Sequence, residues 1–234
     1  TVRANGVYWG GIVLIEAFKY NGNTLFQTVI IMSIYQLKPA FQNLLRPLVK
    51  RLEQRGITAN QVTLFACGLS LILGAILTIF ASISELFYLL PIWLFLRMAL
   101  NAMDGMLARE FNQKSALGGY LNEITDVVAD AALYLPFAFV SPFSAESVIA
   151  FIFLAMMTEF CGVLGQVHGN GRRYDGPLGK SDRAFLIGAL GLAYAYFSEL
   201  PTYLSWLFWL ANLALILTAY RRVKQGLDIS EEGK

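Results

Sequence analysis

The sequence predicts an all-α integral membrane protein with six transmembrane helices and an N-terminal amphipathic juxtamembrane helix. The composition is 56% hydrophobic and only 15% charged, whereas soluble domains are about 25% charged. Long apolar stretches recur along the chain, and basic residues gather in alternate loops. These features exclude a soluble two-domain enzyme, a disordered regulator and a secreted disulfide scaffold. The net charge of +2 indicates no nucleic-acid partner.

Residues 1–31 form an N-terminal segment to which we assign no role. Its apolar stretch, Gly6 to Ile15, is too short to span a membrane, and no cleavable signal pattern is visible. Met32 falls just before the next segment, so one hypothesis is that the functional protein starts there.

Residues 32–57 are predicted to contain an amphipathic juxtamembrane helix. Apolar residues recur at helical spacing among lysines and arginines, at Leu37, Phe41, Leu44, Leu48 and Leu52. This pattern favours a helix on the inner membrane surface. The alternative is a soluble helix that packs on the loops.

Residues 58–225 are predicted to form the six-helix domain, followed by a cytoplasmic tail at 226–234. No charged residue occurs between Gly56 and Ser84, a stretch long enough to cross about 30 Å of hydrocarbon as a helix. The predicted spans are 61–82, 86–109, 118–140, 146–167, 183–199 and 201–220.

Basic residues set the predicted orientation, because short cytoplasmic loops collect Lys and Arg. They occur before the first span and after the second, fourth and sixth spans, at Lys38, Arg46, Lys50, Arg51, Arg55, Arg109, Lys114, Arg172, Arg173, Lys180, Arg183, Arg221, Arg222 and Lys224. The other loops have none. The pattern predicts that both termini are cytoplasmic.

The second and third predicted helices carry polar groups that are costly in a membrane, at least about 2.5 kcal/mol for a charge near the centre. Arg97, Asn101, Asp104 and Ala108 share one face of the second helix. Asn122, Asp126 and Asp130 repeat every four residues on the third. A short loop joins the two helices, so they pack antiparallel and present facing rows of oxygen ligands. The active site is therefore expected between them at the cytoplasmic side.

These rows indicate a site for a hard cation. Carboxylate and amide oxygens suit Mg²⁺ or Mn²⁺ better than zinc, and neither His nor Cys is within reach. The alternative is a set of buried ion pairs that hold the bundle together. Arg97 and Asp130 reach similar depth in antiparallel helices, so we predict that they pair, with Glu159 as the rival partner for Arg97.

One motif carries a family resemblance. The chain reads Asn101-Ala-Met-Asp104-Gly105-Met-Leu-Ala108-Arg109, eight residues, Gly118, three residues, Asn122, three residues, Asp126. This resembles the signature of the CDP-alcohol phosphotransferases, D-x2-D-G-x2-A-R-x8-G-x3-D-x3-D, at six of its eight fixed positions. Asn60 and Thr63, at the head of the first span, look like a further element of that family.

The resemblance implies a membrane enzyme of phospholipid biosynthesis. CDP-diacylglycerol would donate its phosphatidyl group to a small alcohol acceptor, with or without a phosphate group, and release CMP in a reaction that needs Mg²⁺ or Mn²⁺. Asp126 would be the general base. The metal ligands would be Asn101, Asp104, Asn122 and Asp126, and the CDP-lipid pocket would contain Asn60, Thr63, Gly105, Ala108, Arg109, Ser115 and Gly118. The family also implies a homodimer and, for this chain, a bacterial inner membrane.

Two positions depart from the signature, because Asn101 and Asn122 stand where the family has aspartates. An asparagine carbonyl can bind Mg²⁺ but brings no charge. The site could therefore use Glu123 or Asp130 instead, hold one metal, or be inactive. A noncatalytic CDP-lipid-binding relative is one alternative function, and a small-solute transporter is another.

The fourth loop, from Gly171 to Arg183, concentrates four basic residues. One interpretation is cytoplasmic topology with attraction to anionic lipids. The other is a pocket for a phosphorylated acceptor.

Overall fold

The computed structural model describes residues 6–9, 12–15, 19–20, 23–24, 37–169 and 171–231, so the Met32 hypothesis lies outside the described residues. The chain divides into two units, Thr1–Gly56 and Ile57–Lys234, and each is described by itself.

The first unit contains short strands and one helix. Strand β1 (Gly6–Trp9) pairs antiparallel with β2 (Ile12–Ile15), and β3 (Lys19–Tyr20) pairs with β4 (Asn23–Thr24). The all-α prediction did not include these strands. Aromatic and β-branched residues on either side of a Gly-Gly dipeptide favour a hairpin, and this was the missed signal. The predicted amphipathic helix forms as α1 (Leu37–Gln54).

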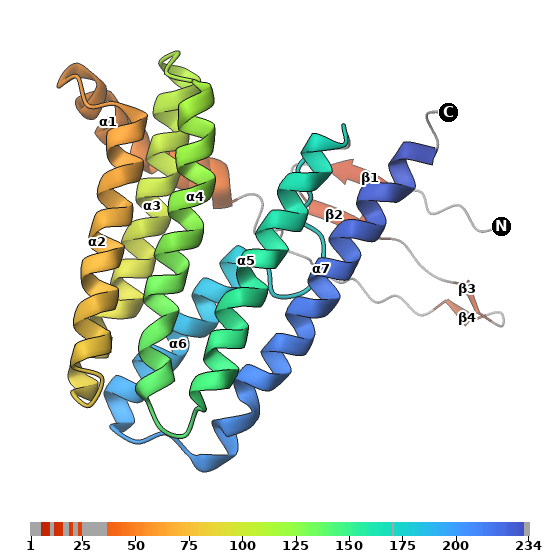
Figure 1. The fold of residues 1–234 in the computed structure, drawn as a ribbon. Coiled ribbons are helices and arrows are strands. Elements are labelled where there is room, and N and C mark those ends of the chain that lie inside the picture. The colour runs from red at the N-terminus through yellow and green to blue at the C-terminus, as the bar shows by residue number, and fades with distance from the viewer. Residues whose placement is uncertain are drawn as a thin grey trace. The chain divides into compact units, whose positions relative to one another are not determined.

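The second unit is a bundle whose helices cover all six predicted spans (Figure 1). Its elements are α2 (Ala59–Ile79), η2 (Ser84–Tyr88), α3 (Leu89–Glu110), α4 (Ala116–Tyr134), η3 (Leu135–Phe139), α5 (Ala145–Val167), α6 (Lys180–Phe197), η4 (Thr202–Trp206) and α7 (Leu207–Glu231).

Four helical segments of the described chain are long and apolar enough to cross a membrane, namely Ala59–Ile79, Ser84–Glu110, Ala145–Val167 and Thr202–Leu227. The other two predicted spans, the third and the fifth, fall on α4 and α6. Helix α4 contains three carboxylates, and α6 begins with several charged residues, which lowers the hydropathy of both.

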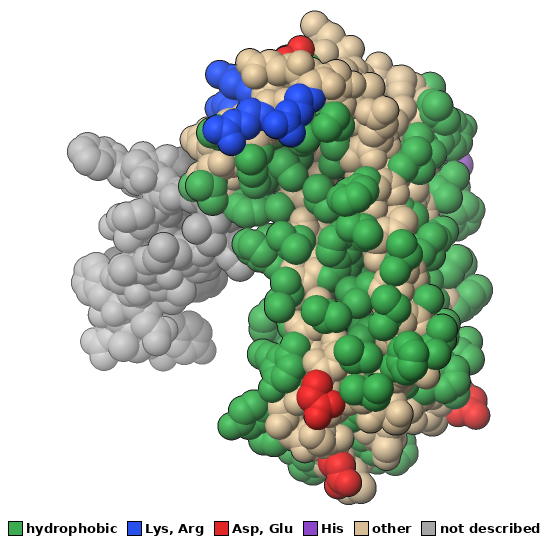
Figure 2. All heavy atoms as spheres, turned by 90° about the vertical axis from the view of Figure 1, so that its left-hand side faces the viewer, with side chains coloured by type: hydrophobic (Ala, Val, Ile, Leu, Met, Phe, Trp, Pro, Cys, Tyr) green, Lys and Arg blue, Asp and Glu red, His purple; other side chains and the backbone are tan. Residues whose placement is uncertain are grey.

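The outer surface of the bundle suits lipid. Large apolar side chains on α2 point outward, among them Leu64, Phe65, Ile72 and Ile79. Figure 2 shows hydrophobic side chains along one face of the molecule, with acidic side chains at its lower end. An apolar surface of this extent is typical of contact with a membrane.

The helices that carry the predicted site pack closely together. Helix α2 contacts α3 and α4, α6 contacts α3, and α5 contacts α4 and α7. At Gly74, an added Cβ would lie only 2.3 Å from the backbone oxygen of Ala132 on α4. Glycine therefore allows the backbones of α2 and α4 to approach each other.

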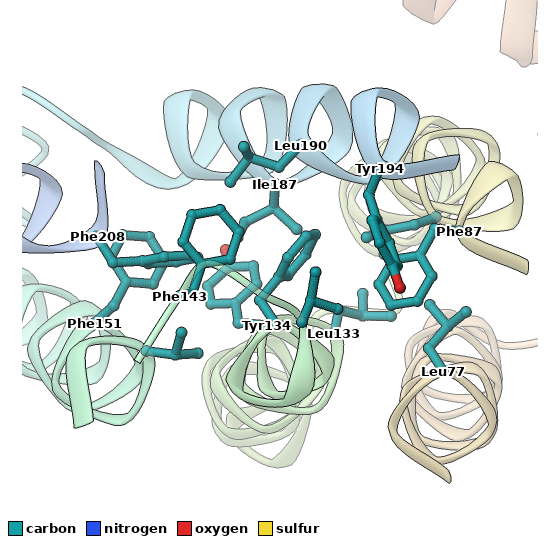
Figure 3. Packing of buried hydrophobic residues seen from close by; sticks show 14 of the residues in the cluster. Leu77, Phe87, Leu133, Tyr134, Phe143, Phe151, Ile187, Leu190, Tyr194 and Phe208 are labelled. Atoms are coloured by element: carbon teal, nitrogen blue, oxygen red, sulfur yellow. The ribbon is translucent and has the colours of Figure 1, made fainter. Parts of the chain in front are cut away.

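Buried aromatic and aliphatic side chains form the hydrophobic core of the bundle (Figure 3). Phe87 meets Tyr194 edge-on with ring centroids 4.9 Å apart, and Phe143 meets Phe208 at 4.8 Å. These contacts join η2 to α6 and the loop before α5 to α7. Edge-on aromatic pairs contribute about 0.5–1.5 kcal/mol beyond their buried area, so this core fixes the helices from which the polar residues project.

Candidate functional site

The predicted metal-binding residues lie on α3 and α4, and α2 contributes a hydrogen bond to one of them. Asp104 on α3 is buried and accepts a hydrogen bond from Thr63 Oγ1 on α2 at 2.7 Å. Asn101 on α3 donates from Nδ2 to Asp126 Oδ1 on α4 at 3.0 Å. Asn122 is half-buried one turn before Asp126. The facing rows predicted from helical spacing therefore form.

Asp126 is held from both sides. Its Oδ1 also accepts from Arg97 at 3.1 Å, and its Oδ2 pairs with the Lys180 ammonium at the start of α6. Arg97 is buried and pairs with Asp130, as predicted. The alternative prediction, a pair between Arg97 and Glu159, was wrong, because Glu159 pairs with other arginines.

Apart from Thr63, which bonds to Asp104, the residues predicted for the CDP-lipid pocket form two groups at the same end of α2, α3 and α4. A Cβ added at Gly118 would lie 2.9 Å from Asn60 Oδ1 and 3.1 Å from Ser115 Oγ. Ser115 also caps α4 by accepting from the Gly118 amide at 3.0 Å. Gly118 therefore allows the asparagine of α2 to lie against the first turn of α4.

The second group lies on α3. The Arg109 guanidinium passes over Gly105, where an added Cβ would lie 3.2 Å from Nη1. Arg109 is exposed and Ala108 half-buried. This arrangement leaves an exposed guanidinium beside a helix surface without a side chain.

A cluster of three arginines, which we call the arginine cluster, surrounds Glu159 on α5. Arg172 and Arg183 lie 2.9 and 2.8 Å from its carboxylate, and Arg222 on α7 lies 3.5 Å away. Arg183 also lies 3.7 Å from Asp130. The cluster is thus connected to the Asp126 site through Asp130 and Arg97.

Glycines on α5 allow the fourth loop to dock there. Added Cβ atoms at Gly162 and Gly165 would lie 2.7 Å from the Arg173 oxygen and 2.9 Å from the Gly171 oxygen. The Arg173 amide donates to the Gly162 oxygen at 3.0 Å. The loop therefore lies directly against α5 and brings Arg172 to Glu159.

All four basic residues of the loop are paired within the chain. Arg172 contacts Glu123 and Glu159, Lys180 contacts Asp126, and Arg183 contacts Glu159. The fourth, Arg173, bonds to Asp175 Oδ2 at 2.8 Å.

Glu123 and Asp130, the two alternative ligands, pair with Arg172 and Arg97 respectively. Within the described residues, no group of three or more His, Cys, Asp or Glu side chains could hold a metal ion. Two carboxylates and two amides remain, at Asp104, Asp126, Asn101 and Asn122. This donor set fits one hard cation better than two, because only two of its four ligands are charged.

The fold and the site define an integral membrane protein with a polar site between helices at one end of its bundle. The family model for CDP-alcohol phosphatidyltransferase matches residues 56–220. The chain belongs to the CDP-alcohol phosphatidyltransferase family.

Several known proteins are similar to the chain. It is 49% identical over 204 residues to an inner membrane protein of Escherichia coli, YnbA, a match that covers 86% of this chain and 100% of that protein. It is 25% identical over 197 residues to the archaetidylinositol phosphate synthase of Pyrococcus horikoshii, covering 82% and 98%.

Solved structures share the fold. The phosphatidylinositol phosphate synthase of Mycobacterium tuberculosis with CDP-DAG bound superposes with a TM-score of 0.63 at 16% identity, covering 77% of this chain and 92% of that chain. The same protein in complex with manganese and citrate also gives 0.63, at 19% identity, covering 77% and 88%.

Proposed function

We propose that the chain transfers the phosphatidyl group of CDP-diacylglycerol to an alcohol and releases CMP. The observation that carries this proposal is that signature residues on α3 and α4 contact each other and the further family element on α2, with Asn101 bonded to Asp126 and Thr63 bonded to Asp104. The related structure with CDP-DAG bound supports the choice of donor.

Each helix has a part in the proposed site. Asn60, Ser115, Gly118, Gly105, Ala108 and Arg109 line the place for the nucleotide and its phosphates. Thr63 and Asn101 orient the two carboxylates, Asp104 and Asp126. A divalent cation, Mg²⁺ or Mn²⁺, would be held by these carboxylates with the amide oxygens of Asn101 and Asn122, and when bound it would neutralise the pyrophosphate and the departing CMP.

Asp126 is the proposed general base. It takes the proton of the acceptor hydroxyl, whose oxygen attacks the lipid-side phosphorus of CDP-diacylglycerol. The new bond joins that phosphorus to the acceptor oxygen, and the bond to the bridging oxygen of CMP breaks. Arg97 positions Asp126 by contacting both its carboxylate and its backbone oxygen at 3.1 Å. Lys180 can leave Oδ2 when substrate binds, because its side chain is 35% exposed.

We further propose six crossings of a bacterial inner membrane with both termini in the cytoplasm. The two additional crossings would be α4 and α6, whose charges pair inside the bundle rather than facing lipid. Intramembrane charges are tolerated when they are paired in this way. A homodimer, as implied by the family, belongs to the same proposal.

The test is CMP release by purified protein in detergent from CDP-diacylglycerol and a panel of alcohols, with Mg²⁺, Mn²⁺ or EDTA. We expect metal-dependent release that Asp126→Asn reduces at least 100-fold, about the size of a lost general base. Glu146→Gln removes the same charge from an exposed site at the start of α5 and should keep full activity. CDP-lipid binding without release would instead indicate the noncatalytic relative that Asn101 and Asn122 suggest.

A further inference from the structure

The arginine cluster has the geometry of an anion site, but one of the chain's own carboxylates already fills it. Arg172, Arg183 and Arg222 come from the fourth loop, α6 and α7, and all three lie within 3.5 Å of Glu159. Arg183 and Arg222 are 0% and 2% exposed, and Glu159 is 7% exposed. Water therefore does little to screen these contacts.

The charges of this region balance without any ligand. The ionic network contains five cations, namely Arg97, Arg172, Lys180, Arg183 and Arg222. Four carboxylates pair with these cations, namely Glu123, Asp126, Asp130 and Glu159. Asp104 lies beside this network and accepts a hydrogen bond from Thr63 Oγ1. Counted together with Asp104, the side chains carry a net charge of zero.

Because the protein side chains already balance one another, the negative charges of the substrates need other cations. The pyrophosphate of CDP-diacylglycerol carries two negative charges, which one divalent cation and the exposed guanidinium of Arg109 would compensate. A phosphate ester as acceptor would bring up to two further negative charges into a site whose arginines are already paired. An alcohol without a phosphate brings none, and an uncompensated charge in a buried site is strongly disfavoured.

We propose that the acceptor is an uncharged alcohol, and that Glu159 determines this specificity by occupying the anion site between Arg172, Arg183 and Arg222. The inference rests on the proposed phosphatidyl transfer and names its second substrate class. Glu159 acts as a specificity residue, because it excludes the phosphate group of a competing acceptor. The structure thus favours the topological interpretation of the basic loop over a pocket for a phosphorylated alcohol.

The experiment compares acceptors that differ only by a phosphate, glycerol against glycerol 3-phosphate and inositol against its 1-phosphate, by kcat/KM for CMP release. We expect the wild-type protein to prefer the uncharged member of at least one pair by tenfold or more. Glu159→Gln keeps the side-chain shape and should shift the ratio at least tenfold toward the phosphate ester, mainly through its KM. Glu146→Gln, on the same helix, should leave the ratio unchanged.

A binding readout accompanies the kinetics. Inorganic phosphate should raise the thermal unfolding midpoint of the Glu159→Gln protein and leave that of the wild type unchanged. A wild-type preference for the phosphate esters, or an unchanged ratio in a folded Glu159→Gln protein, would overturn the inference while phosphatidyl transfer stands. If Glu159→Gln does not fold, the wild-type ratio decides. If no acceptor gives CMP, the proposed function fails, and the phosphate readout alone decides whether Glu159 fills an anion site.

Discussion

Replacing Arg97 with Met should destabilise the bundle by about 3 kcal/mol. The guanidinium is 5% exposed and bonds to Asp130, to Asp126 Oδ1 and to the Asp126 backbone oxygen. Loss of one partner of a buried ion pair costs about 3–5 kcal/mol. The lower figure applies here because Asp126 keeps Lys180, and Asp130 keeps Arg183 at 3.7 Å.

Unfolding in mixed micelles with increasing SDS, followed by fluorescence of the four tryptophans, measures this change. The double variant Arg97→Met/Asp130→Asn also removes the carboxylate that is left with only the more distant Arg183, and should recover at least about 1 kcal/mol. Arg109→Met, an exposed position on the same helix, should stay within about 0.5 kcal/mol of the wild type. An Arg97→Met protein as stable as the Arg109→Met control, or no recovery in the double variant, would refute the reasoning.

Three further substitutions test the packing around the site. Gly118→Ala would place a Cβ 2.9 Å from the asparagine oxygen of α2 and should weaken CDP-diacylglycerol binding about tenfold, whereas Gly119→Ala has no atom within 4 Å and should bind normally in a fluorescent-analogue titration. Gly74→Ala would meet a backbone oxygen of α4 at 2.3 Å and should cost about 1–3 kcal/mol in the same SDS unfolding assay, with Gly68→Ala as the neutral control on α2. Thr63→Val removes the 2.7 Å hydrogen bond to the carboxylate of Asp104 and should lower the affinity for Mn²⁺ several-fold, as measured by electron paramagnetic resonance. An unchanged affinity would contradict the proposal that Thr63 orients this carboxylate.

Helical spacing predicted the part of the site that lies within one hairpin. The intervals between Arg97, Asn101 and Asp104 place them on one face, and the short loop after α3 dictates an antiparallel partner. The Arg97–Asp130 pair followed from equal depth in the two helices. Local sequence was sufficient because both partners belong to consecutive helices.

Contacts between distant segments could not be derived in this way. Nothing in the spacing of Lys180 indicates that α6 begins beside Asp126, and nothing in that of Arg222 shows that α7 packs on α5. These contacts depend on which helices become neighbours, which the apolar faces and glycines of the whole bundle decide together. For the same reason Glu159 was expected as a rival partner of Arg97, although three other arginines surround it.

The short strands before residue 25 were missed for a different reason. The apolar stretch there was tested only against the length of a membrane span and the pattern of a signal peptide. Alternating aromatic and β-branched residues around Gly-Gly were the available signal for a hairpin.

The central claim is tested most directly by following the lipid-side phosphate of CDP-diacylglycerol. The purified protein is incubated with Mg²⁺, an uncharged alcohol and donor labelled with ³²P at that phosphorus. The account predicts that the label moves into a new lipid that carries the acceptor, that CMP is released without label, and that Asp126→Asn abolishes both. Label that stays in CDP-diacylglycerol, or that appears in phosphatidic acid whether or not the alcohol is present, would contradict phosphatidyl transfer.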